Sequence, residues 1–203
     1  MFPIRSLLFL TLFLFFASGE DSTNVPCDEG GEPSLTTPSS LDICGKRLMA
    51  IKRKNGYWCL SLAVWADRKG ETDYRPQSYQ WAKINCEWQN MSLSSFESEE
   101  EFVYVHNRIR KWGGSAITAI WVGSEYNVTS QKYYWNDGVA APTIEPQPKI
   151  LYPNGQVAWV LNSDPNVRGY DSLQVVDPDG GFSKNVSVAV YASYCGRPGK
   201  QLG

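Results

Sequence analysis

Few side chains in this 203-residue sequence could carry catalysis. His106 is the only histidine, so a Ser-His-Asp or Cys-His site would have to use it. It lies in a segment where Phe102 and Ile109 recur at helical spacing, which favours a histidine at the edge of a hydrophobic core. Carboxylates for a glycosidase pair are present, but no spacing singles one out. The sequence therefore predicts a protein that is not an enzyme.

Thiols are the next candidates for chemistry, and they occur at Cys27, Cys44, Cys59, Cys86 and Cys195. No two of them form a Cys-x-x-Cys pair and only one histidine could join them, so we do not expect a zinc site. In a secreted chain such cysteines pair as disulfide bonds. The odd number leaves one thiol over.

Residues 1–19 have the pattern of a signal peptide. Arg5 gives a positive start, residues 7–16 are nearly all leucine and phenylalanine, and residues 17–19 are small. The apolar run is short for a bilayer span, and no later stretch approaches that length. We therefore expect a secreted protein whose mature chain has no membrane span, with an uncleaved anchor as the alternative.

Three Asn-x-Ser/Thr sequons would be accessible to the glycosylation machinery of a secreted chain. They begin at Asn90, Asn127 and Asn185. Asn127, followed by threonine at the third position, is the better acceptor, whereas Asn90 lies between two expected helices and should be partly covered. An unmodified surface asparagine is the alternative at each position.

The charge balance excludes one class of partner. A formal net charge of −2 argues against binding to nucleic acid or anionic membranes by bulk electrostatics. The basic run at residues 52–54 is expected to be a solvated hairpin edge. Residues 20–43, rich in serine, threonine and proline, are expected to form a flexible leader. The remainder has the length of one ordinary domain.

Two helices are expected in the middle of the chain. Residues 79–88 suit a short helix that carries Cys86. Ser98 begins a capping box with Glu101, and an apolar face then recurs at helical spacing until Gly113.

Short strands and one long loop complete the expected domain. The strands are expected at residues 58–65, 116–122, 133–135, 173–176 and 186–195. Four prolines between residues 142 and 153 exclude regular structure at the start of the segment 140–170. Loops held by a rigid scaffold are where binding residues usually lie, so this long loop is the expected recognition region.

Several motifs follow one another in an order that is typical of one family. They are the helix with Trp81, Ala82 and Cys86, the connection with Leu93, Ser95 and Phe96, the helix start at Ser98 and Glu100, the strand Trp121-Val122-Gly123, and later Trp135-Asn136-Asp137-Gly138. This set resembles the C-type lectin-like domain, in particular secreted invertebrate, nematode-type members. The resemblance implies an α+β fold over residues 44–196, with two helices flanking short antiparallel sheets, a long irregular loop region, and residues 197–203 as a tail.

The resemblance also implies two disulfide bonds. Cys86 would join Cys195, and Cys44 would join Cys59 across a hairpin that turns at Asn55-Gly56. Cys27 would then be left over in the leader, where an intermolecular link is preferred to a free or capped thiol.

Sugar-binding members of this family hold a calcium ion whose ligands also bind two sugar hydroxyls. The resemblance implies an acid-Pro-amide triplet, for which the candidates are Glu145-Pro146-Gln147 and, preferred because it follows Trp159, Asp164-Pro165-Asn166. Asp164 and Asn166 would be ligands, and Asp171 would be the later acid. The alternative for Asp164-Pro165-Asn166 is a plain turn.

The last calcium ligands of the family have a weak counterpart in this chain. Asn185 is the only candidate there, it also starts a sequon, and the neighbouring Lys184 places an ammonium where a carboxylate would help. Calcium is therefore a candidate cofactor with an incomplete ligand set.

The function implied by the resemblance is recognition of carbohydrate, with a glycan or glycoprotein as partner and microbial glycans in innate defence as one setting. Asp164, Asn166, Trp159 and Asp171 would be the ligand-binding residues. The alternative is a calcium-independent module that binds a protein or lipid through exposed aromatic rings such as those of Tyr152, Trp159 and Tyr170. This step from fold to function is an analogy.

Overall fold

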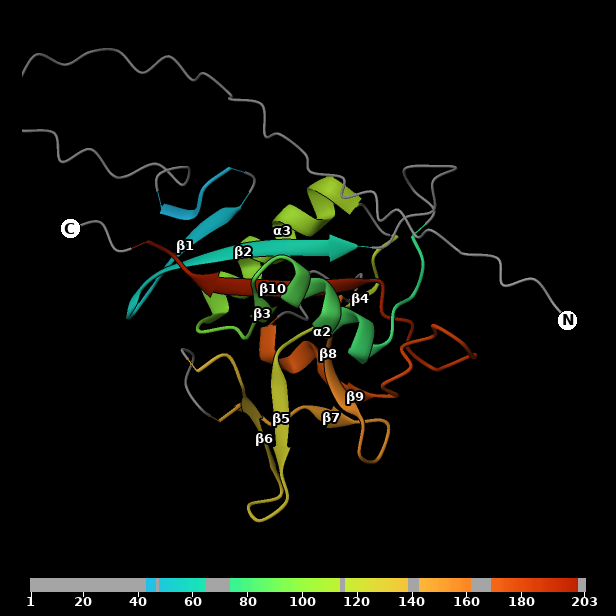
Figure 1. Cartoon of the computed structure of the whole chain (residues 1–203). Helices are drawn as coiled ribbons and strands as arrows, with labels where there is room; N and C mark the ends of the chain where they lie inside the picture. Colours follow the sequence, from blue (N-terminus) through green and yellow to red (C-terminus); the bar gives the residue numbers. More distant parts are fainter. Residues whose placement is uncertain are drawn as a thin grey trace, which may run out of the picture.

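The strands in the described part of the chain form an eight-stranded sheet and a separate two-stranded hairpin (Figure 1). The computed structural model describes residues 43–46, 48–64, 74–113, 116–138, 143–161 and 169–200. The main sheet has the order β1-β2-β10-β4-β8-β9-β7, with β3 beside β10, while β5 pairs with β6. The elements are β1 (Met49–Arg53), β2 (Gly56–Val64), α2 (Tyr79–Trp88), β3 (Ser92–Leu93), α3 (Glu99–Gly113), β4 (Ala119–Trp121), β5 (Ser124–Asn127), β6 (Lys132–Trp135), β7 (Lys149–Ile150), β8 (Gln156–Val160), η1 (Gly169–Ser172), β9 (Leu173–Val176) and β10 (Ala192–Pro198).

Strand β10 joins the two ends of the domain, because it lies between β2 and β4. It is antiparallel to β2 and β3 but parallel to β4, and β7 is parallel to β9. The expectation of purely antiparallel sheets is therefore wrong for two strand pairs. A parallel pair requires a long connection between its strands, and some seventy residues lie between β4 and β10.

The two expected helices form where the sequence predicts them. In α2, the Ser78 hydroxyl accepts the backbone N–H of Trp81 at 3.3 Å. At the start of α3, the Ser98 hydroxyl accepts the N–H of Glu101 at 3.3 Å. The return bond of the capping box goes one residue further back, because the Glu101 carboxylate accepts the N–H of Glu97 at 3.1 Å.

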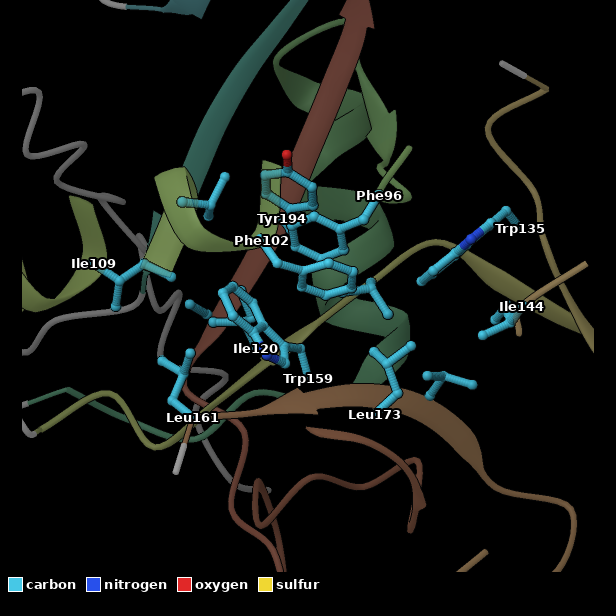
Figure 2. Close-up of a cluster of buried hydrophobic side chains, with 14 of the residues drawn as sticks. Phe96, Phe102, Ile109, Ile120, Trp135, Ile144, Trp159, Leu161, Leu173 and Tyr194 are labelled. Atoms are coloured by element: carbon cyan, nitrogen blue, oxygen red, sulfur yellow. The ribbon is translucent and has the colours of Figure 1, made fainter. Parts of the chain in front are cut away.

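The main core is a cluster of aromatic rings between α3 and the sheet (Figure 2). Phe96 stacks on Phe102 with ring centroids 3.7 Å apart and on Tyr194 with centroids 4.5 Å apart. Trp159 of β8 meets both phenylalanine rings edge-on at 5.1 and 5.2 Å. Each aromatic side chain buries about 150–250 Å², and such rings dominate the packing energy of a core. This cluster therefore holds α3 on the sheet.

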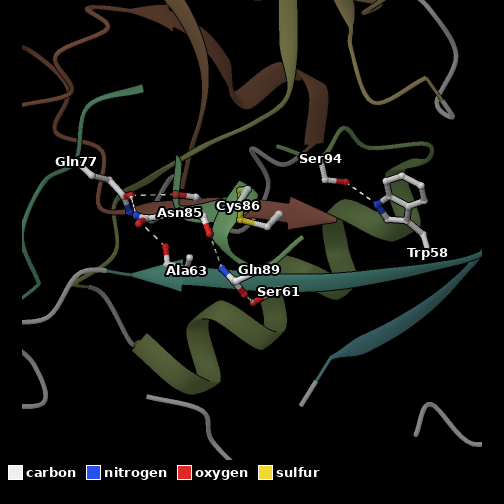
Figure 3. The surroundings of a disulfide bond; sticks show 10 residues. Trp58, Ser61, Ala63, Gln77, Asn85, Cys86, Gln89 and Ser94 are labelled. Carbon is white, nitrogen blue, oxygen red and sulfur yellow. Dashed lines mark hydrogen bonds between the residues drawn. A yellow bond between two sulfur atoms is a disulfide. The ribbon is translucent and has the colours of Figure 1, made fainter. Parts of the chain in front are cut away.

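The structure contains both disulfide bonds that the resemblance implies. Cys44 joins Cys59, and Cys86 of α2 joins Cys195 of β10 across 109 residues of sequence. Figure 3 shows the polar contacts beside the second bond: the Gln89 side chain accepts the Ser61 hydroxyl at 2.9 Å, and the Gln77 amide donates to the Ala63 carbonyl at 3.3 Å. A loop of this length limits the unfolded chain by about 4–5 kcal/mol in the entropy model.

The C-terminal segment differs from the sequence prediction. Residues 186–191 are not in a strand, and β10 begins only at Ala192. The N–H of Val190 donates to the Gly180 carbonyl at 2.9 Å, which ties this segment to the preceding turn, and only the N–H of Tyr191 reaches β4, at the Ala119 carbonyl. The two ends of the described chain meet, because Ile43 is 1% exposed and its carbonyl accepts the N–H of Lys200 at 3.0 Å.

A buried ionic cluster centres on Arg53, in the basic run that was expected to be solvated. This expectation is wrong for Arg53, which is 4% exposed and forms ion pairs with Glu101 at 2.5 Å and Asp137 at 3.1 Å. The Tyr194 hydroxyl donates to Glu101 at 2.7 Å, and burial, reinforced by that carboxylate, raises the pKa of Tyr194 well above its ordinary value. Although burial opposes it, the hydrogen bond and charge of Glu101 raise the pKa of Arg53.

Close backbone approach explains the glycine of the Trp121-Val122-Gly123 motif. A Cβ atom on Gly123 would collide with the Leu93 carbonyl oxygen, and the Gly123 N–H donates to the Ser94 carbonyl at 2.8 Å. Within the described residues, no helix is both long and apolar enough to cross a membrane.

Candidate functional site

The first half of the long loop is fixed by Gln147. Its side-chain oxygen accepts the Tyr133 N–H at 2.7 Å, and its side-chain nitrogen donates to the carbonyls of Tyr133 at 3.2 Å and Ile144 at 2.5 Å. The Gln147 side chain therefore bonds both backbone groups of Tyr133, as a neighbouring strand would do along β6. Glu145, across a cis peptide bond from Pro146, is exposed and forms an ion pair with Lys132 at 3.1 Å. The triplet at residues 145–147 is thus occupied by contacts within the protein.

The middle of the expected loop is a turn between β7 and β8 that presents Tyr152, so residues 149–150 and 156–160 are strands rather than irregular loop. The N–H groups of Leu151 and Tyr152 both donate to the Val175 carbonyl of β9 at 3.0 Å, and the Gly155 N–H donates to the Tyr152 carbonyl at 3.1 Å. Asn154 has φ +57°, a conformation that asparagine tolerates better than most residues. Because these bonds fix the backbone, the Tyr152 side chain, 42% exposed, projects from a rigid base.

The turn after β9 forms a network of polar groups. Asp177 accepts the Asp179 N–H at 2.9 Å, and its other oxygen forms an ion pair with the Lys184 ammonium at 3.0 Å. Asp179 accepts the hydroxyl of Ser183 at 2.5 Å and its N–H at 3.1 Å. The bond from the Asp179 N–H, and then Lys184, lower the pKa of Asp177. Desolvation raises the pKa of Asp179, but the bonds from Ser183 outweigh it and the pKa is lowered.

The two turns follow neighbouring parallel strands, and Tyr152 is bonded to Val175, two residues before Asp177. The pKa of the Lys184 ammonium is raised chiefly by its hydrogen bond and attraction to Asp177, and the phenol of Tyr152 adds to the rise. Figure 1 shows β7 and β9, which carry the two turns, side by side. We call the group of Tyr152, Asn154, Asp177, Asp179 and Lys184 the Tyr152 surface. It combines one exposed ring with carboxylate, amide and ammonium groups.

The described part of this surface does not fit a calcium ion. Calcium takes six to eight oxygen ligands, several of them carboxylates. No group of three or more histidine, cysteine, aspartate or glutamate side chains with metal-binding geometry occurs among the described residues. The Lys184 ammonium bonds Asp177 directly, so a cation already balances the acid. Asn185, the only candidate ligand beside Lys184, is exposed.

The predicted site residues have different outcomes. Asp164 and Asn166 lie outside the described residues, and so does the side chain of Asp171, whose backbone belongs to η1. The prediction that Trp159 is exposed is wrong, because its side chain is 1% exposed and packs inside the aromatic core. His106 is half-buried with its ring 6.1 Å from that of Trp159, which confirms the predicted core-edge position.

Sequence reasoning missed the Asp177–Lys184 pair and the structural role of Gln147. The signal for the first was present, since Asp177-Pro178-Asp179-Gly180-Gly181 is a strong turn that brings residues four to seven apart together. No local signal identifies Gln147, because two of its three hydrogen bonds go to Tyr133 of β6, on the other side of residues 136–142.

Comparisons with known proteins identify the fold. No family model matches the sequence, and no curated protein matches it. Human lithostathine is similar in structure, with a TM-score of 0.51 and 12% identity over 83% of this chain and 99% of that one. The calcium-independent C-type lectin SPL-2 from Saxidomus purpuratus has a TM-score of 0.46 and 14% identity over 69% of this chain and 86% of that one. The carbohydrate-recognition domain of the mouse scavenger receptor C-type lectin has a TM-score of 0.47 and 12% identity over 79% and 100%.

Identities this low show the fold and nothing beyond it. The order of the motifs, the two disulfide bonds and the likeness to lithostathine agree with one another. The chain has the C-type lectin-like fold.

Proposed function

We propose that this protein is a secreted recognition module that binds carbohydrate through the Tyr152 surface, without a calcium ion held there. The observation that carries the proposal is the turn fixed on the Val175 carbonyl, which presents an exposed tyrosine ring beside the Asp177–Lys184 pair. A pyranose ring has an apolar face that packs on an aromatic side chain and hydroxyl groups that bond carboxylates and amides. A rigid ring with a few convergent polar groups supplies both kinds of contact.

Pre-organisation supports this surface as a binding site. The Tyr152 backbone is already fixed by its hydrogen bonds, and Asp177 and Asp179 are already held by bonds from the turn. Binding therefore costs little ordering entropy in the protein. Asn154 is exposed within this surface and can donate to sugar hydroxyls or ring oxygens.

Calcium-dependent binding through Asp164, Asn166 and Asp171 is the competing proposal. It requires these residues to assemble a ligand set without Asp177, whose carboxylate is neutralised by Lys184. A calcium titration of the mature protein separates the two proposals, because an ion that binds only the folded state raises the melting temperature by mass action. A rise of several degrees would favour the calcium site, and an unchanged melting temperature would favour the Tyr152 surface alone.

A glycan array in the presence of a chelator tests the proposal, with microbial glycans as the first ligands. Tyr152→Ala should reduce binding about tenfold, as expected for loss of a well-packed ring at the upper end of aromatic contacts. Tyr126→Ala is the matched control, because Tyr126 is also 42% exposed but lies on β5. Equal glycan binding by the Tyr152→Ala and Tyr126→Ala variants would contradict a binding site at the Tyr152 surface.

A protein or lipid ligand is the second candidate function, and one observation favours it. Ile150 and Leu151 precede Tyr152 and are 62% and 40% exposed, so an apolar strip adjoins the ring. Under this alternative, Ile150→Ser would weaken binding as much as Tyr152→Ala. Under the carbohydrate proposal, only Tyr152→Ala weakens it.

Glycosylation at the three sequons is proposed with the secreted location. Asn90, Asn127 and Asn185 are all exposed. The Asn127 side-chain oxygen accepts the N–H of Thr129 at 2.9 Å, and Asn127 is the last residue of β5, where the hairpin turns. Mass spectrometry of the secreted protein should find a glycan at Asn127. A secreted protein with unmodified Asn127 would contradict this.

A further inference from the structure

Helix α2 has an apolar stripe on its outer face as well as on its inner one. Ala82 and Cys86 are buried against the sheet. On the other side, Trp81, Ile84 and Trp88 follow one another at intervals of three and four residues, and the two tryptophans are 36% and 57% exposed. Residues at this spacing share one face of a helix. An outward stripe of this kind is a docking face for another element.

The stripe continues onto the turn after β9. Phe182, 41% exposed, lies with its ring centroid 6.5 Å from that of Trp81, which is 6.0 Å from that of Trp88. With about 150–250 Å² per aromatic side chain, these exposed fractions amount to roughly 200–330 Å² of aromatic surface. Patches that approach this size on a monomer are often functional.

The ring orientations decide which ligand fits. Trp81 and Trp88 are inclined at 72° to each other, and Trp81 and Phe182 at 41°. Rings at these angles do not form a flat platform for successive sugar rings. They form ridges and grooves, which are the shape by which one helix packs on another.

We propose that this face, Trp81, Ile84, Trp88 and Phe182, pairs with the same face of a second copy of the chain. In an antiparallel pairing of two α2 helices centred between Ile84 and Asn85, Trp81 lies opposite Trp88 of the second copy. In this register the exposed Lys83 lies within one residue, a rise of about 1.5 Å, of the level of the exposed Glu87 of the second copy. Aromatic and charged groups are thus complementary in one two-fold arrangement, as an isologous interface requires.

The position of the leader supports a second copy as the occupant. Cys44 and Lys46, where the leader enters the fold, line the same hollow as Trp88 and Arg197. Cys27 precedes Cys44 by 17 residues and is the one cysteine outside the two disulfide bonds. The chain that leads to Cys27 therefore leaves the fold at the edge of the aromatic face. A disulfide bond between the Cys27 residues of two copies would link the two chains from that edge.

The aromatic area buried between two copies and the Cys27 link together set the expected strength of dimerisation. The aromatic surface of two copies is roughly 400–650 Å², below the 1,200–2,000 Å² of stable interfaces. The faces alone should therefore associate weakly, with a dissociation constant on the order of 100 μM. A disulfide bond between the two Cys27 residues would raise the effective concentration of the second copy into the millimolar range, which exceeds this constant and closes the dimer. Dimerisation would present two Tyr152 surfaces to one target.

Sedimentation velocity of the secreted protein tests this inference. N-glycans are removed enzymatically first, because Asn90 lies two residues beyond Trp88. Cys27→Ser protein should be a reversible dimer at high micromolar concentration, and Trp88→Glu in that background should raise the dissociation constant at least tenfold. Tyr126→Glu is the control, since Tyr126 is exposed on β5 away from this face. Near-UV circular dichroism checks that each variant is folded.

A charge swap tests the register itself. Lys83→Glu should weaken the dimer, and Lys83→Glu combined with Glu87→Lys should restore it. A Cys27→Ser protein that stays monomeric at every concentration would overturn the inference, as would equal dimerisation of the Trp88→Glu and Tyr126→Glu variants. Failure of the double variant to recover would overturn the antiparallel register. A monomer that loses glycan binding on Trp88→Glu would assign the face to a sugar instead.

Discussion

Replacing Arg53 by methionine should destabilise the fold strongly. The change removes ion pairs with Glu101 and Asp137, a 2.6 Å bond to the Ser95 carbonyl, and the packing of the guanidinium over Trp58 at 4.8 Å. Two carboxylates would remain buried without their cation. Breaking a buried ion pair in this way costs about 3–5 kcal/mol. At about 2–4 °C per kcal/mol for a domain of this size, the melting temperature should fall by roughly 6–20 °C.

Calorimetry of the oxidised, mature variant measures this loss. Lys52→Met is the matched control, because Lys52 is the preceding residue of β1 and is exposed. The control should change the free energy of unfolding by less than about 0.5 kcal/mol. An Arg53→Met loss below about 1 kcal/mol would refute the reasoning that this cluster joins β1, α3 and the loop after β6.

Three further outcomes follow from the same structure. Gln147→Ala should lower the free energy of unfolding by about 1–3 kcal/mol, because backbone groups of β6 lose their partners, and a urea titration that shows no change would contradict this. The lowered pKa of Asp177 contributes stability above its unfolded pKa, and that stability is lost as pH falls through the folded value. Removing the ion pair with Lys184→Gln should make the melting temperature less sensitive to acid, and identical pH profiles would count against the pair. Cys86→Ala with Cys195→Ala should cost about 4–5 kcal/mol, measured by thermal unfolding, and a loss below 2 kcal/mol would exclude this role for the bond.

Local sequence signals predicted the helices, and the family resemblance implied the disulfide pairing. The capping serine and the apolar period placed α3, and the ordered motifs around Trp121 and Cys86 led to the fold. These features depend on residues close together in sequence, or on a pattern that the whole family shares. Such information is present in a single chain.

The burial of particular side chains could not be predicted in the same way. Arg53 looked like part of a solvated basic run, yet its partners Glu101 and Asp137 lie 48 and 84 residues away. Trp159 stood in the loop region by sequence, but β8 brings it beneath Phe96 and Phe102. Contacts between residues far apart in sequence decide whether a side chain is exposed, and the local hydrophobic periodicity does not reveal these contacts. For the same reason the outer stripe of α2 was not recognised as exposed.

The most direct test of carbohydrate recognition at the Tyr152 surface is an NMR titration of the isotope-labelled protein with a glycan identified on the array, in chelator. The account predicts amide shift changes concentrated at residues 149–155 and 177–185, and their loss in Tyr152→Ala but not in Tyr126→Ala. Changes centred elsewhere, or seen only after calcium is added, would contradict it.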